Sequence, residues 1–96
     1  MANGYKTHQV VAEGSFLSIS WYVAKNKRKG GYQLFTVIDL RSADVTFKEY
    51  AKGIAEEVHR QLQSQRLNLR PSFVEKQSEV MMNGVTVFVL ATLNPA

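Results

Sequence analysis

The chain has 96 residues and no cysteine, which is enough for one ordinary domain and excludes a scaffold held by disulfides. Its content of 45% hydrophobic and 10% aromatic residues is that of a globular protein and excludes a disordered one. The 12 Lys and Arg residues against 8 Asp and Glu give a net charge of +4, which permits nucleic acid, acidic protein or anionic membrane as partners without selecting among them. We therefore treat residues 1–96 as a single domain.

Three features of the sequence bear on where the protein resides. Met1–His8 is polar and lacks the apolar core of a signal peptide. The longest apolar run, Val85–Ala91, is far shorter than the ~20 residues that span a bilayer. The lack of cysteine favours a reducing compartment. We expect a cytoplasmic protein with no membrane partner, a flexible N-terminus over residues 1–8 and a C-terminal tail over 94–96.

A first β-hairpin is predicted on the two sides of a basic loop. Side chains alternate between the two faces from Ser15 to Ala24 and again from Tyr32 to Leu40, as in strands with one buried face. The loop between them, Lys25–Gly31, ends in two glycines, which supply the positive φ that a hairpin loop needs. Gln9–Ala12 is a candidate for an extra N-terminal edge strand.

One amphipathic helix follows. Thr46 and Glu49 fit a capping box, in which the threonine hydroxyl accepts a hydrogen bond from the glutamate backbone N–H. Apolar side chains then recur at three- and four-residue steps and predict one buried stripe, made of Phe47, Tyr50, Ala51, Ile54, Ala55, Val58 and Leu62. The helix is expected to end near Gln65, before Pro71.

A second β-hairpin is predicted around Asn83-Gly84, the preferred pair for a two-residue type I′ turn. This turn sets Met82 opposite Val85 and Val80 opposite Val87. The face expected to lie under the helix contains Val74, Val80, Met82, Val85, Val87 and Val89. The last strand is apolar on both sides, which favours a central position in the sheet.

These elements predict an α+β fold of order ββαββ, with the helix on one face of a four-stranded antiparallel sheet. The other face is then uncovered, and a monomer rarely leaves a large apolar surface in water. That face is expected to draw on Phe16, Tyr22, Phe35, Val37, Phe88 and Leu90. We predict that Phe16, Tyr22, Phe35, Phe88 and Leu90 form an interface between two copies of the chain. Burial under the N-terminal residues or under a partner protein are the alternatives.

The basic loop is the candidate binding site. Lys25, Lys27, Arg28 and Lys29 place four cations within five residues at a hairpin tip. A basic tip can grip phosphates of a nucleic acid, and Arg28 can make a bidentate contact. Tyr32, at the base of the loop, is a candidate for stacking on a base. The alternative is a solvated turn whose charges only keep the protein soluble.

Catalytic and metal-binding patterns are missing from the sequence. No Gly-x-Ser-x-Gly elbow surrounds a serine. His8 and His59 are the only histidines and there is no cysteine, so the ligands for a zinc site are lacking. We expect no catalytic residues, no metal and no cofactor.

Two functional hypotheses remain, from different classes. The leading one is a small non-catalytic protein that contacts nucleic acid through the Lys25–Lys29 tip. The alternative is a protein-interaction module, a small inhibitor or adaptor, that acts through the open sheet face or a strand edge. Fold alone does not decide between them.

Overall fold

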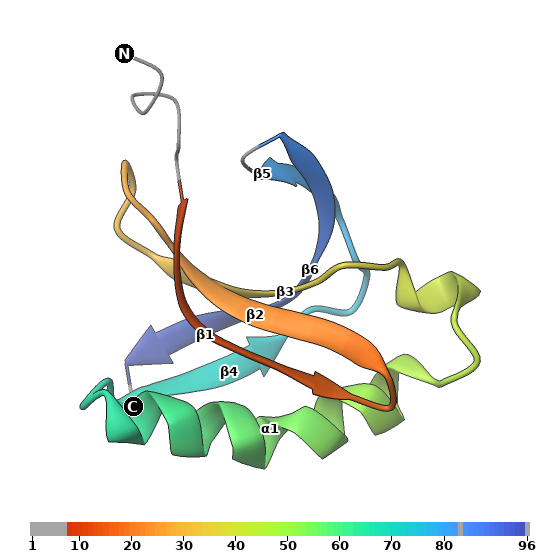
Figure 1. Ribbon diagram of the computed structural model, residues 1–96, viewed down its shortest axis with the longest axis horizontal. Helices are drawn as coiled ribbons and strands as arrows, with labels where there is room; N and C mark the ends of the chain where they lie inside the picture. Colours follow the sequence, from red (N-terminus) through yellow and green to blue (C-terminus); the bar gives the residue numbers. More distant parts are fainter. Residues whose placement is uncertain (1–7, 83, 96) are drawn as a thin grey trace.

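The computed structural model describes residues 8–82 and 84–95 and has an α+β architecture (Figure 1). Within these residues, one α-helix packs against a six-stranded antiparallel sheet. The elements in chain order are β1 (His8–Phe16), β2 (Ile19–Asn26), β3 (Tyr32–Thr36), the short 3-10 helix η2 (Leu40–Ser42), α1 (Phe47–Ser64), β4 (Leu69–Phe73), β5 (Glu79–Met82) and β6 (Val85–Pro95). The predicted class is confirmed, whereas the ββαββ order and the count of four strands are wrong.

The first expected strand is in fact two strands. A tight turn at Leu17 and Ser18 divides it into β1 and β2, which pair antiparallel. Both turn residues have positive φ, 53° and 66°, although neither is glycine or asparagine. The expected edge strand at Gln9–Ala12 is part of β1, and His8 is a buried residue of that strand rather than part of a flexible terminus. Residues 1–7 of that predicted terminus lie outside the described residues.

The strand order across the sheet is β1-β2-β3-β6-β4, with β5 also paired to β6. β4 and β5 lie on the same side of β6. The segment that connects them also runs beside β6, because Val74 N–H donates to Leu90 O and Val89 N–H donates to Ser78 O. The central position of the last strand is confirmed. Asn94 pairs with β4, so the predicted C-terminal tail is part of the sheet up to the last described residue.

The second hairpin has the predicted register. Met82 lies opposite Val85 and Val80 lies opposite Val87. Gly84 has a φ of 86°, as a type I′ turn requires of its second residue. Asn83, the first residue of that predicted turn, lies outside the described residues.

The helix forms where the periodicity predicts it. Thr46 is the N-cap, and its hydroxyl oxygen accepts a 3.2 Å hydrogen bond from Glu49 N–H. The helix ends at Ser64, with Gln65 as C-cap. Its buried residues are Tyr50, Ala51, Ile54, Val58 and Leu62, all members of the predicted stripe.

The main core lies between α1 and the sheet. Trp21, Val23 and Leu34 from the sheet pack there with the helix stripe and are almost completely buried. The Tyr50 hydroxyl donates a 3.0 Å hydrogen bond to the backbone oxygen of Ile19, which joins the helix to β2. The main core consists of Ala12, Ile19, Trp21, Val23, Leu34, Leu40, Tyr50, Ile54, Val58, Leu62, Leu90, Ala91 and Leu93.

A second core fills the opposite face of the sheet. Here the β5–β6 hairpin bends over β2 and β3, as the blue strands of Figure 1 show. The second core consists of Ala24, Phe35, Met82, Val87 and Val89, with Tyr22, Val74 and Val80 packed against it. The expectation that the valine-rich face of this hairpin lies under the helix is therefore wrong.

The reason is a β-bulge in β6. Leu34 pairs with Ala91 and Phe35 with Val89, so Leu90 is an extra residue on β6. The extra residue reverses which side chains face the helix beyond that point. Residues before the bulge, such as Val87, join the second core, and Ala91 and Leu93 join the main core.

The outer edge of the sheet at β1 is covered by two side chains of the helix. Gln61 Nε2 donates a 3.0 Å hydrogen bond to the backbone oxygen of Glu13. Gln65 Nε2 donates in the same way to the backbone oxygen of Val11. These bonds occupy carbonyl groups that an unpaired edge strand would otherwise offer to another chain.

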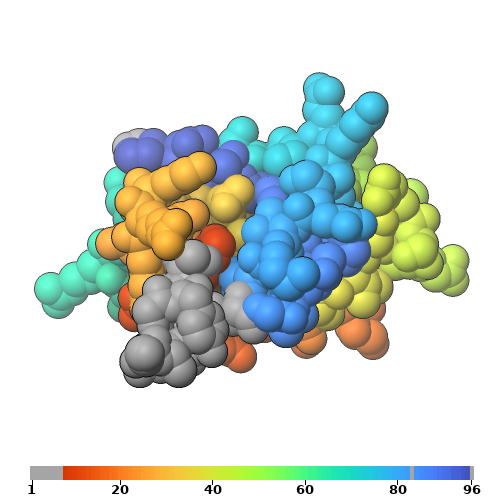
Figure 2. All heavy atoms as spheres, turned by 90° about the horizontal axis from the view of Figure 1, so that it is seen from above, coloured from red at the N-terminus to blue at the C-terminus, as the bar shows by residue number. Residues whose placement is uncertain are grey.

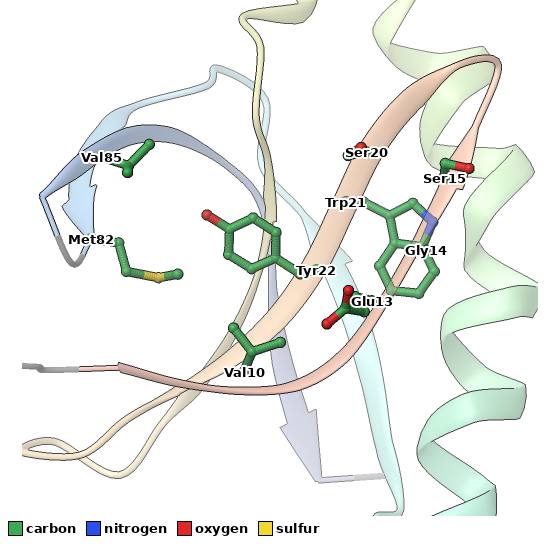
Figure 3. A pocket seen from close by; sticks show the side chains of 9 residues that line it. All are labelled: Val10, Glu13, Gly14, Ser15, Ser20, Trp21, Tyr22, Met82 and Val85. Atoms are coloured by element: carbon green, nitrogen blue, oxygen red, sulfur yellow. The ribbon is translucent and has the colours of Figure 1, made fainter.

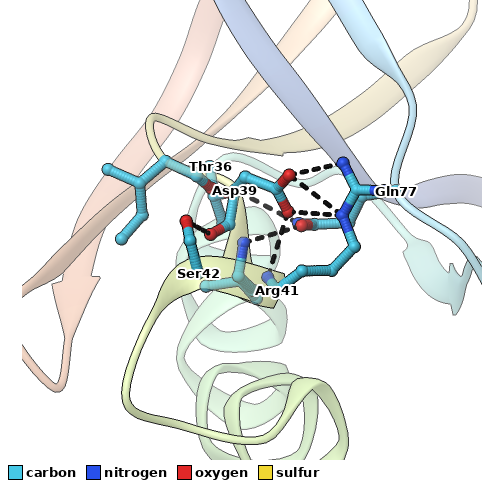
Figure 4. Close-up of polar contacts among 7 residues, drawn as sticks. Thr36, Asp39, Arg41, Ser42 and Gln77 are labelled. Carbon is cyan, nitrogen blue, oxygen red and sulfur yellow. Dashed lines mark hydrogen bonds and ion pairs between the residues drawn. The ribbon is translucent and has the colours of Figure 1, made fainter.

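A buried glutamine joins the two long connections of the fold (Figure 4). Gln77, between β4 and β5, accepts a 2.8 Å hydrogen bond from Leu40 N–H and donates one of 3.3 Å to the Thr36 hydroxyl. Beside it, the exposed Arg41 side chain pairs with Asp39. No helix within the described residues is both long and apolar enough to cross a membrane.

Candidate nucleic-acid interface and neighbouring pockets

Lys25 is in the last part of β2, and Lys27, Arg28 and Lys29 are in the loop that joins β2 to β3 (orange in Figure 2), so this loop begins two residues later than predicted. We refer to Lys25–Lys29 as the basic loop. Its conformation is fixed by Asn26, whose side-chain oxygen accepts hydrogen bonds from the backbone N–H groups of Arg28 (2.9 Å) and Lys29 (3.0 Å). The Asn26 carbonyl also accepts from Gly30 N–H at 2.7 Å. Gly30 has a φ of 81°, as expected for a loop glycine. The cations therefore stand on a defined turn.

The charges of this loop are not compensated nearby. Lys27, Arg28 and Lys29 are exposed, and Lys25 is half-buried. Within residues 8–82 and 84–95, none of these four cations forms an ion pair with a carboxylate. Lys25 instead lies over the Tyr32 ring, with its Nζ atom 5.8 Å from the ring centroid. The loop is thus a free positive surface that attracts anions.

Tyr32 is not fully exposed, as an open stacking platform for a base would be. It is half-buried and packs against the main core, so one part of its ring is unavailable to a ligand. It also lines a hollow of about 300 Å³ between the loop and the end of β6. The other residues of this hollow are mainly polar and include Asn26, Lys29, Gln33, Thr92 and Asn94.

The structure separates the five residues of the predicted interface. Phe16 packs against the main core and Leu90 is fully buried in it, so both lie on the helix side. Phe35 is fully buried in the second core. Tyr22 and Phe88 are half-buried. The open apolar face expected from one helix is absent from the described part of the chain, because the sheet itself curls over it. Whether the chain forms a homodimer stays a prediction.

The curl creates a pocket of about 600 Å³ that sequence analysis missed. Figure 3 shows Val10 and Glu13 of β1 on one side, Tyr22 of β2 in the middle, and Met82 and Val85 of the β5–β6 hairpin on the other side. We call it the sheet pocket. The alternating pattern indicates which side chains share a face of a strand. The approach of the β5–β6 hairpin to β1 depends instead on the bulge in β6 and on the curvature of the sheet, and neither leaves a signal in the sequence.

Trp21 forms part of the wall of the sheet pocket. A side chain at Gly14 would have its Cβ 2.7 Å from the indole, so the indole packs directly on the β1 backbone. The indole Nε1 is buried and is the one such side-chain atom without a hydrogen-bond partner in the described residues. On the helix side, Trp21 also borders a smaller cavity of about 210 Å³ that Glu57 and Arg60 line.

Ionisable groups in the described residues do not form a metal-binding cluster. No three His, Asp or Glu side chains there are arranged to hold a metal ion. Burial raises the pKa of Tyr22 and lowers the pKa of His8 from their ordinary values. The hydrogen bond from Arg41 lowers the pKa of Asp39, and both groups are at the surface.

Comparison with family models, with curated protein sequences and with solved structures returns no significant match.

Proposed function

We propose that this chain is a small non-catalytic binding protein whose Lys25–Lys29 loop grips the phosphate backbone of a nucleic acid. The observation that carries the proposal is a set of four cations at the end of β2 and in the loop after it, none of which pairs with a carboxylate of the described residues. The Asn26 side chain holds the backbone of this loop in place. A preformed loop loses less conformational entropy when it binds than a flexible one does.

The hollow beside the loop adds a second contact region. A strand whose phosphates lie on Lys27 and Arg28 passes the hollow that Tyr32 borders. The amide groups of Gln33 and Asn94 are hydrogen-bonding groups of the kind that contact sugars and base edges. In this arrangement Tyr32 offers its free side to a base and does not form a full stacking platform.

The expected affinity is weak and depends on salt. Each phosphate contact contributes a slope of about −0.7 to the dependence of log K on log salt for a single strand, so four contacts give about −2.8. Between 50 and 200 mM salt this corresponds to a loss of about 50-fold in affinity. Fluorescence anisotropy with a labelled single-stranded oligonucleotide measures it, and a duplex of the same sequence tests for a preference.

The decisive variant changes Lys25, Lys27, Arg28 and Lys29 to glutamine together. We expect it to lose the salt-dependent binding while its circular dichroism spectrum stays unchanged. A matched control removes the same charge elsewhere, at the exposed residues Lys48, Lys52, Arg66 and Lys76. If both variants lose binding equally, the net charge and not the loop is responsible, and the proposal is wrong.

The alternative, a protein-interaction module, is supported by a different observation. Val37 and Ile38 follow β3 directly and are 43% and 40% exposed, and Leu17 at the β1–β2 turn is 52% exposed. The β1 edge is less available to a partner, because Gln61 and Gln65 bind its carbonyl groups. Retention of a stoichiometric protein after nuclease treatment of a pull-down favours this alternative.

A further inference from the structure

From the sheet pocket we infer a second binding site, for a small amphipathic cation, that is, an ammonium group attached to an aromatic or aliphatic body. The site is separate from the basic loop and does not depend on the proposed function. It combines an apolar hollow, the ring of Tyr22 and one carboxylate that forms no ion pair with any described residue.

The size and lining of the pocket suit a small molecule. Its volume of about 600 Å³ lies within the range of about 300–1,000 Å³ that ligand sites occupy. Val10 and Val85 are 43% and 58% exposed and stand on its two opposite rims. Met82 and the Tyr22 ring lie between them, as Figure 3 shows. An apolar body placed there removes these side chains from water.

The charge of the pocket selects a cation. Among the described residues that line it, Glu13 is the single charged one. Its carboxylate forms no ion pair or hydrogen bond with any described residue, although its backbone oxygen is held by Gln61. A ligand ammonium therefore finds an unpaired carboxylate next to an apolar wall, and a ligand carboxylate finds repulsion.

The Tyr22 ring strengthens the same preference. Glu13 lies directly opposite Tyr22 across the β1–β2 pair, so a cation near the carboxylate is also near the phenol ring. The faces of aromatic rings attract organic cations, most of all tryptophan and tyrosine. Ser15 and Ser20 line the pocket as well and provide hydroxyl groups for the remaining ammonium protons.

The experiment compares two probes of similar shape and opposite charge, phenylpropylammonium and phenylpropionate. Trp21 is the only tryptophan of the chain, and its buried indole packs on the β1 backbone beside the pocket, so its fluorescence follows binding. We expect saturable binding of the ammonium and at least about tenfold weaker binding of the carboxylate. Non-specific association with a chain of net charge +4 predicts the reverse order.

Two variants, at Glu13 and Val85, and one control variant, at Glu75, locate the site. Glu13→Gln should weaken ammonium binding about threefold to fivefold, and Glu75→Gln, which removes an exposed carboxylate from the β4–β5 connection, should leave it unchanged. Val85→Lys places a cation at the rim, where valine is already exposed, and should reverse the preference between the two probes. Both variants are at exposed positions and are expected to fold.

The inference is overturned if the ammonium probe does not bind the intact chain, or if both probes bind equally. It is also overturned if Glu13→Gln and Glu75→Gln have the same effect. Oligonucleotide binding by the Lys25–Lys29 loop is measured separately, so failure of either proposal leaves the other unaffected.

Discussion

Replacement of Leu17 by asparagine and Ser18 by glycine tests the turn that divides the first expected strand. Both residues have positive φ, 53° and 66°. This left-handed conformation costs an L-residue about 1–2 kcal/mol. Asn-Gly is the pair that such a two-residue turn prefers. Leu17 is 52% exposed, so little packing is lost. After allowance for the greater unfolded-state entropy of glycine, we expect the free energy of unfolding to rise by about 1–2 kcal/mol.

Thermal unfolding followed by circular dichroism measures this change. For a domain of this size the expected increase in Tm is about 5–10 °C. Ser20→Gly is the matched control, because Ser20 is an exposed residue inside β2 where glycine lowers stability by about 0.5–1 kcal/mol. If Ser18→Gly and Ser20→Gly shift Tm in the same direction, the backbone at Ser18 is not left-handed and the turn has been placed wrongly.

Two further predictions concern the contact between helix and sheet. Gly53→Ala should lower the free energy of unfolding by about 1–3 kcal/mol, because the new Cβ would lie 2.1 Å from the Phe16 ring. Helix propensity alone predicts the opposite, a more stable variant. A urea titration measures the change, and a stabilised variant would contradict this packing. Burial raises the pKa of Tyr50 to about 12 from 10.0, so the free energy of unfolding should be insensitive to this group below pH 10 and should fall as the pH rises toward 12. Tyr50→Phe should remove that part of the alkaline decline, and an unchanged pH dependence would show that Tyr50 ionises freely in the folded protein.

The elements with strong local signals were predictable. The Thr46 cap and the apolar stripe placed the helix correctly, and Asn83-Gly84 set the register of the second hairpin. Both depend on contacts between residues close in sequence. The connection between β2 and β3 was also located, because its glycines and cations are contiguous in the chain, although Lys25 and Asn26 belong to β2 and not to the loop.

The errors arise where geometry departs from simple alternation. The turn at Leu17 has no glycine or asparagine to mark it, and the alternation of apolar residues continues through it. The bulge at Leu90 reverses the faces of β6 without any change in residue type. Since the position of the β5–β6 hairpin follows from that bulge, neither the second core nor the sheet pocket was within reach of pattern analysis.

The hydrogen bonds from Gln61 of α1 and from its C-cap Gln65 cover the exposed edge of β1, so this strand depends on the helix to keep its edge from pairing with other chains. Before α1 docks, the carbonyl groups of Val11 and Glu13 are open to the strands of other chains. A partly folded state with the sheet formed and the helix detached would therefore offer a template for pairing with another chain. We expect a variant that lacks both glutamine side chains to give a lower yield of folded material.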